Sequence, residues 1–296
     1  MTVKTIAARL TGAVTAAFIA GSASAQTALE DLPIVGAPEP GATGFQPAVT
    51  ELMRDIVWLD NMLLVIITII TLFVMGLLAW VILRYNSKRN PEPATFTHNS
   101  PLEVAWTVVP IVILVFIGAF SLPVLFNQQE IPEGDVNITV TGNQWFWTYE
   151  YPDEDIFFES YMIGYNMGNM NAEIEADLVE AGYSADEFRL ATDTSVVVPM
   201  GATVVMTVTG ADVIHSWTIP AFGVKQDAVP GRFAQLWFNA EQEGIYFGQC
   251  SELCGKDHAY MPITVKVVAP EVYEQWLEDV RADLALPNSQ RTMQTW

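Results

Sequence analysis

The chain has 296 residues, 51% of them hydrophobic and 16% charged, and its 13 Lys and Arg oppose 34 Asp and Glu for a formal net charge of −21 at pH 7. This acidic balance excludes a nucleic-acid-binding protein, because phosphate backbones attract basic surfaces. Only two Cys and three His are present, which excludes a disulfide scaffold and any metal system that needs four or more imidazoles. The mean hydropathy is still positive, at +0.28, so charged and apolar residues must be segregated along the chain.

The first 25 residues are typical of a secretory signal peptide. Lys4 and Arg9 form a basic start, residues 10–20 an apolar middle, and residues 23–25 a small-residue cleavage site. The apolar run is shorter than the ~20 residues that a membrane-spanning helix needs, which disfavours an anchor. Residues 26–57 follow as an extracytoplasmic segment, in which Pro and Gly are frequent enough to prevent a long helix.

Two uncharged, apolar runs at residues 61–83 and 104–126 are each long enough to cross a bilayer as a helix. The loop between them, residues 84–103, is basic, because it carries Arg84, Lys88 and Arg89. By the positive-inside rule this loop is cytoplasmic. We therefore expect a transmembrane hairpin over residues 58–126, with the N- and C-terminal segments both in the periplasm or an equivalent exterior space.

The remaining residues form an acidic exterior part with 7 Lys and Arg against 26 Asp and Glu, a net charge of −19 over residues 127–296. Short β-branched or alternating runs, separated by Gly and Pro, predict strands at residues 137–141, 195–199, 203–209, 234–238 and 263–268. They indicate an all-β sandwich or small barrel over residues 127–270. A Glu- and Ala-rich helical insertion is expected at residues 171–188, and an amphipathic helix at 271–284 opens the C-terminal segment, 271–296.

Four side chains that bind metals lie within twelve residues, namely Cys250, Cys254, His258 and Met261. Thiolate, imidazole and thioether together are the soft donors that copper prefers. The last three resemble the ligand loop of a mononuclear blue-copper protein, whose second His would come from an earlier strand. His215 is the candidate, at the end of a predicted strand, because His98 belongs to the cytoplasmic loop. Cys250 is then surplus, and two bridging sulfurs could instead hold two copper ions, with a loop carbonyl completing one of them.

Two other interpretations of the cysteines are a disulfide bond and a zinc site. A Cys250–Cys254 disulfide suits an oxidising compartment, but it leaves His258 and Met261 without a role. Zinc suits two Cys and two His, but Met is a poor zinc ligand and the spacing is unlike that of a zinc finger. The spacing favours copper.

With these residues in hand, the chain resembles subunit II of the cytochrome c oxidases, most closely its alphaproteobacterial members. The resemblance rests on the C-x₃-C-x₃-H-x₂-M loop, the His 35 residues before its first Cys, the segment GNQWFWTYEY at residues 142–151 and DAVPGR at 227–232. It implies a two-helix transmembrane hairpin followed by a cupredoxin-like Greek-key domain with a dinuclear copper centre, CuA. Asn143 and Phe146 depart from the residues that the family commonly has there; neither is a ligand.

The resemblance also implies the roles of individual residues. Copper is bound by the side chains of His215, Cys250, Cys254, His258 and Met261 and by the main-chain carbonyl of Glu252. The carboxylate of Glu252 helps to bind magnesium at the boundary with the catalytic subunit. Trp145 is the residue through which an electron from cytochrome c reaches the copper. Glu103 lies near the mouth of a proton pathway, although from the sequence alone it could equally be a charge at a helix end.

The acidic residues that would dock a basic cytochrome c are Glu150, Glu159, Asp193 and Asp212, and on a domain of charge −19 they would steer association. The implied activity is electron transfer in a terminal oxidase of the bacterial plasma membrane, whose subunit I reduces oxygen and supports proton pumping; subunit III is a further expected partner. The chain itself lacks the imidazoles for that chemistry. Three alternatives are a copper-delivery protein, a quinol oxidase subunit, which would lack the copper ligands, and a nitrous oxide reductase-like domain, which would not need the hairpin.

Overall fold

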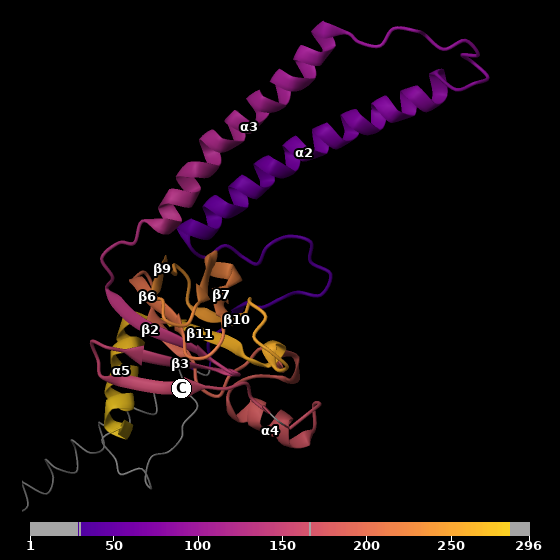
Figure 1. Ribbon diagram of the computed structural model, residues 1–296. Coiled ribbons are helices and arrows are strands. Elements are labelled where there is room, and N and C mark those ends of the chain that lie inside the picture. Colours follow the sequence, from indigo (N-terminus) through magenta and orange to yellow (C-terminus); the bar gives the residue numbers. More distant parts are fainter. Residues whose placement is uncertain (1–28, 30, 166, 285–296) are drawn as a thin grey trace, which may run out of the picture. The chain divides into compact units, whose positions relative to one another are not determined.

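The structure, a computed structural model, describes Leu29, residues 31–165 and residues 167–284 (Figure 1). The chain divides into two compact units, of which one comprises residues 54–129 and the other the segments on either side of them. The expected signal peptide, residues 1–25, and the end of the expected C-terminal segment, residues 285–296, lie outside the described residues.

The smaller unit contains two long helices joined by a loop, namely α3 (Ser100–Gln129) and all but the first three residues of α2 (Glu51–Arg84). Both are long and apolar enough to cross a membrane. At 1.5 Å per residue, each exceeds the ~30 Å of a bilayer core. The ring of Trp58 in α2 contacts that of Phe120 in α3, with centroids 5.7 Å apart. Each helix includes one of the two predicted spans and extends beyond it at both ends.

The starts of both helices are set by polar caps. The Thr50 hydroxyl accepts a hydrogen bond from Met53 N at 3.0 Å, so α2 begins at Glu51, seven residues before the expected boundary. At α3 the Asn99 side chain accepts from Leu102 N at 3.2 Å, while Glu103 Oε1 accepts from Asn99 N at 3.3 Å. Because Glu103 is the fourth residue of α3 and not the third, this reciprocal pair is a variant of the capping box, and it gives Glu103 a structural role at the helix end.

The larger unit is a β-sandwich (Figure 1). One sheet has the strand order β1 (Ile34–Gly36), β10 (Gly244–Gln249), β11 (Pro262–Val268), β5 (Val196–Pro199). The other has the order β4 (Ile156–Ser160), β3 (Phe146–Tyr151), β2 (Val136–Asn143), β6 (Thr203–Gly210), β9 (Ala234–Asn239). A separate two-stranded ladder pairs β7 (His215–Ile219) with β8 (Val224–Ala228). Buried side chains from all three form one hydrophobic cluster.

All five predicted strands are present as β2, β5, β6, β9 and β11, and α5 (Pro270–Leu284) matches the predicted C-terminal helix. The predicted helix at residues 171–188 was too long. Only α4 (Ala172–Glu180) is helical there, followed by a single 3₁₀ turn at Ala185–Glu187. Gly182 follows the helix with a left-handed φ of 83°, which ends it.

His215 lies at the start of β7 and not, as predicted, at the end of the preceding strand, because β6 stops at Gly210 and a turn intervenes. The neighbouring antiparallel strands β10 and β11 are paired as far as Gln249 and Pro262. The loop from 250 to 261 therefore leaves and re-enters the sheet at adjacent positions, which brings its two ends together.

Candidate metal centre

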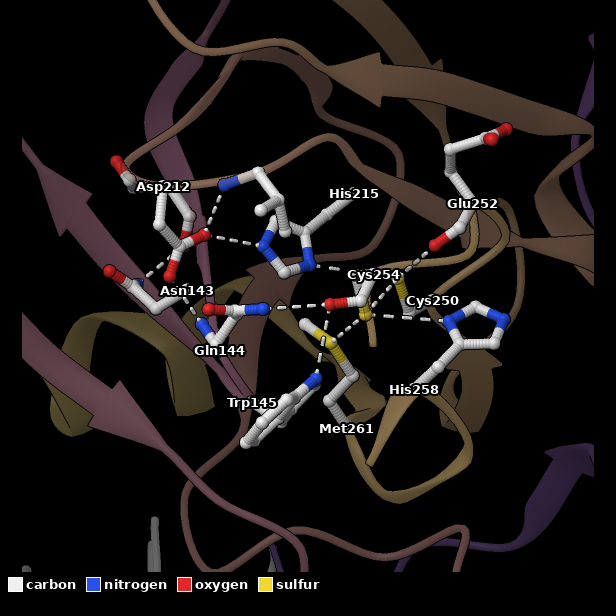
Figure 2. Close-up of polar contacts among 12 residues, drawn as sticks. Asn143, Gln144, Trp145, Asp212, His215, Cys250, Glu252, Cys254, His258 and Met261 are labelled. Atoms are coloured by element: carbon white, nitrogen blue, oxygen red, sulfur yellow. Dashed lines mark hydrogen bonds and ion pairs between the residues drawn. The ribbon is translucent and has the colours of Figure 1, made fainter. Parts of the chain in front are cut away.

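The sulfur and nitrogen donors predicted from the sequence converge between β7 and the β10–β11 loop (Figure 2). The main chain closes the loop, because Cys250 N donates to Met261 O at 3.4 Å. A second bond, from Ser251 N to Ser216 O at 3.0 Å, fixes the loop to the strand that begins with His215. The donors thus come from a backbone frame that is hydrogen-bonded on both sides.

The donors form two similar halves around a pair of sulfurs. The Sγ atoms of Cys250 and Cys254 are 3.9 Å apart. Cys250 Sγ lies 3.9 Å from His215 Nδ1 and 3.3 Å from the Glu252 carbonyl oxygen. Cys254 Sγ lies 3.5 Å from His258 Nδ1 and 3.5 Å from the Met261 thioether sulfur. Each thiol therefore has one imidazole and one weaker donor beside it.

This geometry bears on the alternatives for the two cysteines. Both are free, and their separation of 3.9 Å is far beyond the ~2.05 Å of a disulfide bond. His215, Cys250, Cys254 and Met261 are buried, whereas His258 is half-buried. A buried set of two thiolates, imidazole and a thioether matches the soft-ligand preference of copper, and the thioether is a poor ligand for zinc. The residues present therefore fit copper.

The two thiols differ in acidity in the metal-free chain. Burial raises the pKa of Cys250, but several hydrogen bonds, of which that with His215 is the largest, together outweigh burial and lower the pKa from 9.0 to about 7. Burial, followed by the charge of the neighbouring Cys250, raises the pKa of Cys254 to about 12. Copper binding to both thiolates must consequently displace at least one proton.

Asp212 lies behind the buried imidazole. Its Oδ1 is 2.9 Å from His215 Nε2, on the side of the ring opposite Cys250 (Figure 2). Burial raises the pKa of Asp212, but hydrogen bonds from His215, Val213 and Gln144 outweigh that effect, and the pKa is lowered. A carboxylate on the second nitrogen fixes the ring orientation and presents Nδ1 to the metal.

Side chains of the aromatic segment at 144–147 donate hydrogen bonds to main-chain carbonyls of the ligand loop. Gln144 Nε2 and Trp145 Nε1 both donate to Cys254 O, at 2.9 and 3.3 Å. Trp147 Nε1 donates to Met261 O at 3.3 Å. Gly255 permits this approach, because a Cβ there would lie 2.9 Å from Trp145 Cζ2 and its φ is +130°. Trp145 is thus joined to the metal loop by one hydrogen bond.

Comparisons with known proteins match both units. Residues 136–268 match the family "Cytochrome C oxidase subunit II, periplasmic domain", and residues 38–124 match the transmembrane domain of the same subunit. The chain is 64% identical over 277 residues to cytochrome c oxidase subunit 2 of Cereibacter sphaeroides, covering 92% of this chain and 91% of that one. This chain belongs to the cytochrome c oxidase subunit II family.

A further relative and a solved structure are also similar to this chain. A probable cytochrome c oxidase subunit 2 of Rickettsia felis is 43% identical over 242 residues, which cover 81% of this chain and 72% of that one. A crystal structure of the periplasmic domain of subunit II of cytochrome oxidase from Bradyrhizobium japonicum has 40% identity and a TM-score of 0.44, covering 52% of this chain and 99% of that one. As a subunit II, the chain is a membrane protein with two transmembrane helices and the electron-transfer subunit of a haem–copper terminal oxidase.

In this subunit II, the four predicted docking carboxylates have different surroundings. Glu150 and Glu159 are exposed on β3 and β4. Asp193 is partly buried, and its Oδ1 accepts from the main-chain nitrogens of Tyr161 and Thr194, each at 2.8 Å. Both carboxylate oxygens of Asp212 have a partner: Oδ1 contacts His215 Nε2, and Oδ2 accepts from Gln144 N. Asp193 and Asp212 thus have structural roles in hydrogen bonding.

Residues that sequence reasoning missed lie around the predicted ligands. Gln144 and the orienting contact of Asp212 with His215 were not assigned, and neither was Gly142, where a Cβ would lie 2.8 Å from His215. An Asp three residues before a candidate His is a weak signal that could have pointed to the contact. No comparable signal points to Gly142, because His215, which it contacts in space, is distant in the sequence.

Proposed function

We propose that the chain binds two copper ions as a dinuclear CuA centre and relays single electrons from cytochrome c to a haem in subunit I. The observation that carries this proposal is the two-fold donor arrangement, in which two thiols 3.9 Å apart each have an imidazole and a weaker donor beside them. The proposed ligands are the side chains of His215, Cys250, Cys254, His258 and Met261 and the carbonyl of Glu252. When bound, copper supplies a one-electron redox centre.

The chain's own residues would keep these donors fixed during turnover. The loop is hydrogen-bonded to Ser216 and across its own ends, and Asp212 orients the buried imidazole. A frame that does not rearrange between redox states lowers the reorganisation that each electron transfer requires. Burial of both sulfurs also keeps water away from the thiolates.

Cytochrome c is the proposed electron donor. The exterior part carries a net charge of −19, and Glu150 and Glu159 present exposed carboxylates. Such a surface attracts a basic partner and makes association fast and sensitive to salt. Trp145, half-buried and hydrogen-bonded to Cys254 O, is the proposed electron-accepting residue, with Asp193 and Asp212 as further docking carboxylates.

The remaining roles concern subunit I and the membrane. Glu252 turns its carboxylate away from the sulfurs while its carbonyl faces Cys250 (Figure 2), which suits a shared magnesium ion outside the copper centre. Three basic residues, Arg84 at the end of α2 and Lys88 and Arg89 in the loop that follows, support a cytoplasmic loop and periplasmic termini. Glu103, at that end of α3, is proposed to border a proton pathway of subunit I.

Copper counting and electron paramagnetic resonance on the full-length chain in detergent test the proposal. We expect two copper ions per chain and hyperfine structure from two equivalent copper nuclei. Cys250→Ser should lose this signal, whereas Glu252→Gln, which retains the carbonyl, should keep it. One copper with a blue-copper signal would refute the dinuclear centre. Two coppers that reduced cytochrome c cannot reduce, but that a chelator removes readily, would instead indicate copper delivery.

A further inference from the structure

Lys256 places a positive charge against the proposed electron-accepting tryptophan. Its Nζ lies 5.3 Å from the centroid of the Trp145 ring, a cation–π distance, although the Lys256 side chain is 74% exposed. It directly follows Gly255, whose missing Cβ allows Trp145 to approach the loop. Of the cations in the described part of the chain, it is the one that packs on this ring.

The ammonium is held from a second side. Asp257 Oδ2 lies 3.3 Å from Lys256 Nζ, and the Tyr165 hydroxyl donates to the same oxygen at 3.4 Å. Lys256 therefore neutralises a carboxylate beside Trp145 while it covers part of the indole. Both effects oppose a basic partner, which gains from free carboxylates and must bring its haem edge close to the ring.

We propose that Lys256 is a specificity-determining residue that weakens docking of c-type cytochromes with lysines crowded around the haem edge and favours those that present a neutral or acidic group there. This inference rests on the proposed function, because it presumes that cytochrome c delivers its electron at Trp145. The effect is local: one lysine changes the net charge of −19 very little, but it lies at the point of closest approach.

The test uses the assembled oxidase and a mitochondrial-type cytochrome c with a ring of lysines around its haem edge. Lys256→Gln should lower KM by about two- to fivefold at low ionic strength and leave kcat unchanged, because it removes one exposed cation–π contact and one repulsive charge. The dissociation constant for oxidised cytochrome c should fall by the same factor. The difference should vanish near 1 M salt, where the Debye length is about 3 Å.

Two control variants isolate the position of the charge. Lys256→Arg keeps a cation over the ring and should retain the wild-type KM. Arg281→Gln removes one positive charge from α5, where Arg281 pairs with Glu154, and should leave KM within experimental error. All variants should keep the wild-type copper resonance signal, which shows that the ligand loop is intact.

The outcomes separate this inference from the proposed function. If the wild-type oxidase turns over with cytochrome c but Lys256→Gln leaves KM unchanged or raises it, the role of Lys256 is refuted and the proposed function stands. An equal decrease in Arg281→Gln also refutes it, because net charge would then explain the effect. If the wild-type oxidase does not oxidise cytochrome c, both are wrong.

Discussion

Replacing Asp212 by alanine should weaken copper binding, although in sequence Asp212 looks like a surface charge for docking. Its Oδ1 lies 2.9 Å from His215 Nε2 and accepts from Val213 N at 2.6 Å, and its Oδ2 accepts from Gln144 N at 2.8 Å. Asp212→Ala removes the orienting acceptor of a fully buried imidazole and the anchor of the residue before Trp145. The imidazole then turns more freely about its side-chain bonds, and its Nδ1 meets the metal in fewer orientations.

The expected size follows from the exposure of this contact. Loss of a carboxylate behind a metal-binding histidine costs about 10- to 100-fold in metal affinity. The His215 side chain is fully buried, but that of Asp212 is 36% exposed, so water can replace part of the lost hydrogen bonding. We therefore expect the lower end of the range, about tenfold, which corresponds to about 1.4 kcal/mol.

The assay is competition for copper between the full-length chain in detergent and a chelator of known affinity. Glu150→Ala is the matched control: it removes the same charge from an exposed residue of β3 and should leave copper affinity unchanged while it raises KM for cytochrome c. Asp212→Asn keeps an acceptor for His215 but turns a donor toward Gln144 N, so an intermediate affinity is expected. Wild-type copper affinity in Asp212→Ala, with a changed salt dependence of turnover, would refute the reasoning and leave docking as its role.

Three further predictions concern the residues around the copper. Trp145→Phe removes the indole donor to Cys254 O, and should slow oxidation of cytochrome c in the oxidase while the copper resonance signal persists; unaffected turnover would exclude it as the electron acceptor. Gly142→Ala places a Cβ 2.8 Å from the side chain of buried His215. It should lower the free energy of unfolding by about 1–3 kcal/mol, measured by calorimetry, and reduce the copper content, measured by metal analysis. Copper affinity should rise with pH, because binding displaces protons from the donors. The rise should be about tenfold per unit well above pH 7, where the proton of Cys254 is displaced, and steeper toward lower pH, where Cys250 and His215, whose pKa is raised by its hydrogen bonds with Cys250 and Asp212 in spite of burial, are protonated too. Chelator competition from pH 6 to 9 measures this slope, and a flat profile would contradict the thiol pKa values.

The candidate metal donors could be selected from the sequence because they are concentrated in one short loop. Four of them fall between 250 and 261, and a loop whose ends enter neighbouring strands must bring its residues together. The two membrane helices could also be predicted from the sequence, since long uncharged apolar runs have few other interpretations. In both cases the information is local in sequence.

Strand β10 was missed for a physical reason. Its segment, Gly244–Gln249, contains two glycines and does not alternate, because five of its six residues are buried. Glycine normally argues against a strand. Gly248 is needed here because a Cβ would lie 1.8 Å from Thr218 O, so the backbone of β7 fills the space of a side chain. Only the packed structure reveals such an approach.

The role of Asp212 was hidden for a similar reason. In sequence it resembles Glu150, since both are isolated carboxylates on an acidic domain. The two differ only once the turn between β6 and β7 is formed and directs the Asp212 carboxylate toward His215 and Gln144. A spacing of three residues does not define that direction, because the turn could present the side chain to solvent equally well.

The hydrogen bonds around the loop join the tryptophan segment and the metal ligands into one unit. The Cys254 carbonyl accepts from Gln144 and Trp145, and the Met261 carbonyl accepts from Trp147 and from the main chain of Cys250. The position of Trp145 is therefore coupled to that of the loop that carries the candidate metal donors. The exposed carboxylates on β3 and β4 lie outside this unit. The chain can thus change its affinity for a partner through surface charge without disturbing the geometry of the metal site.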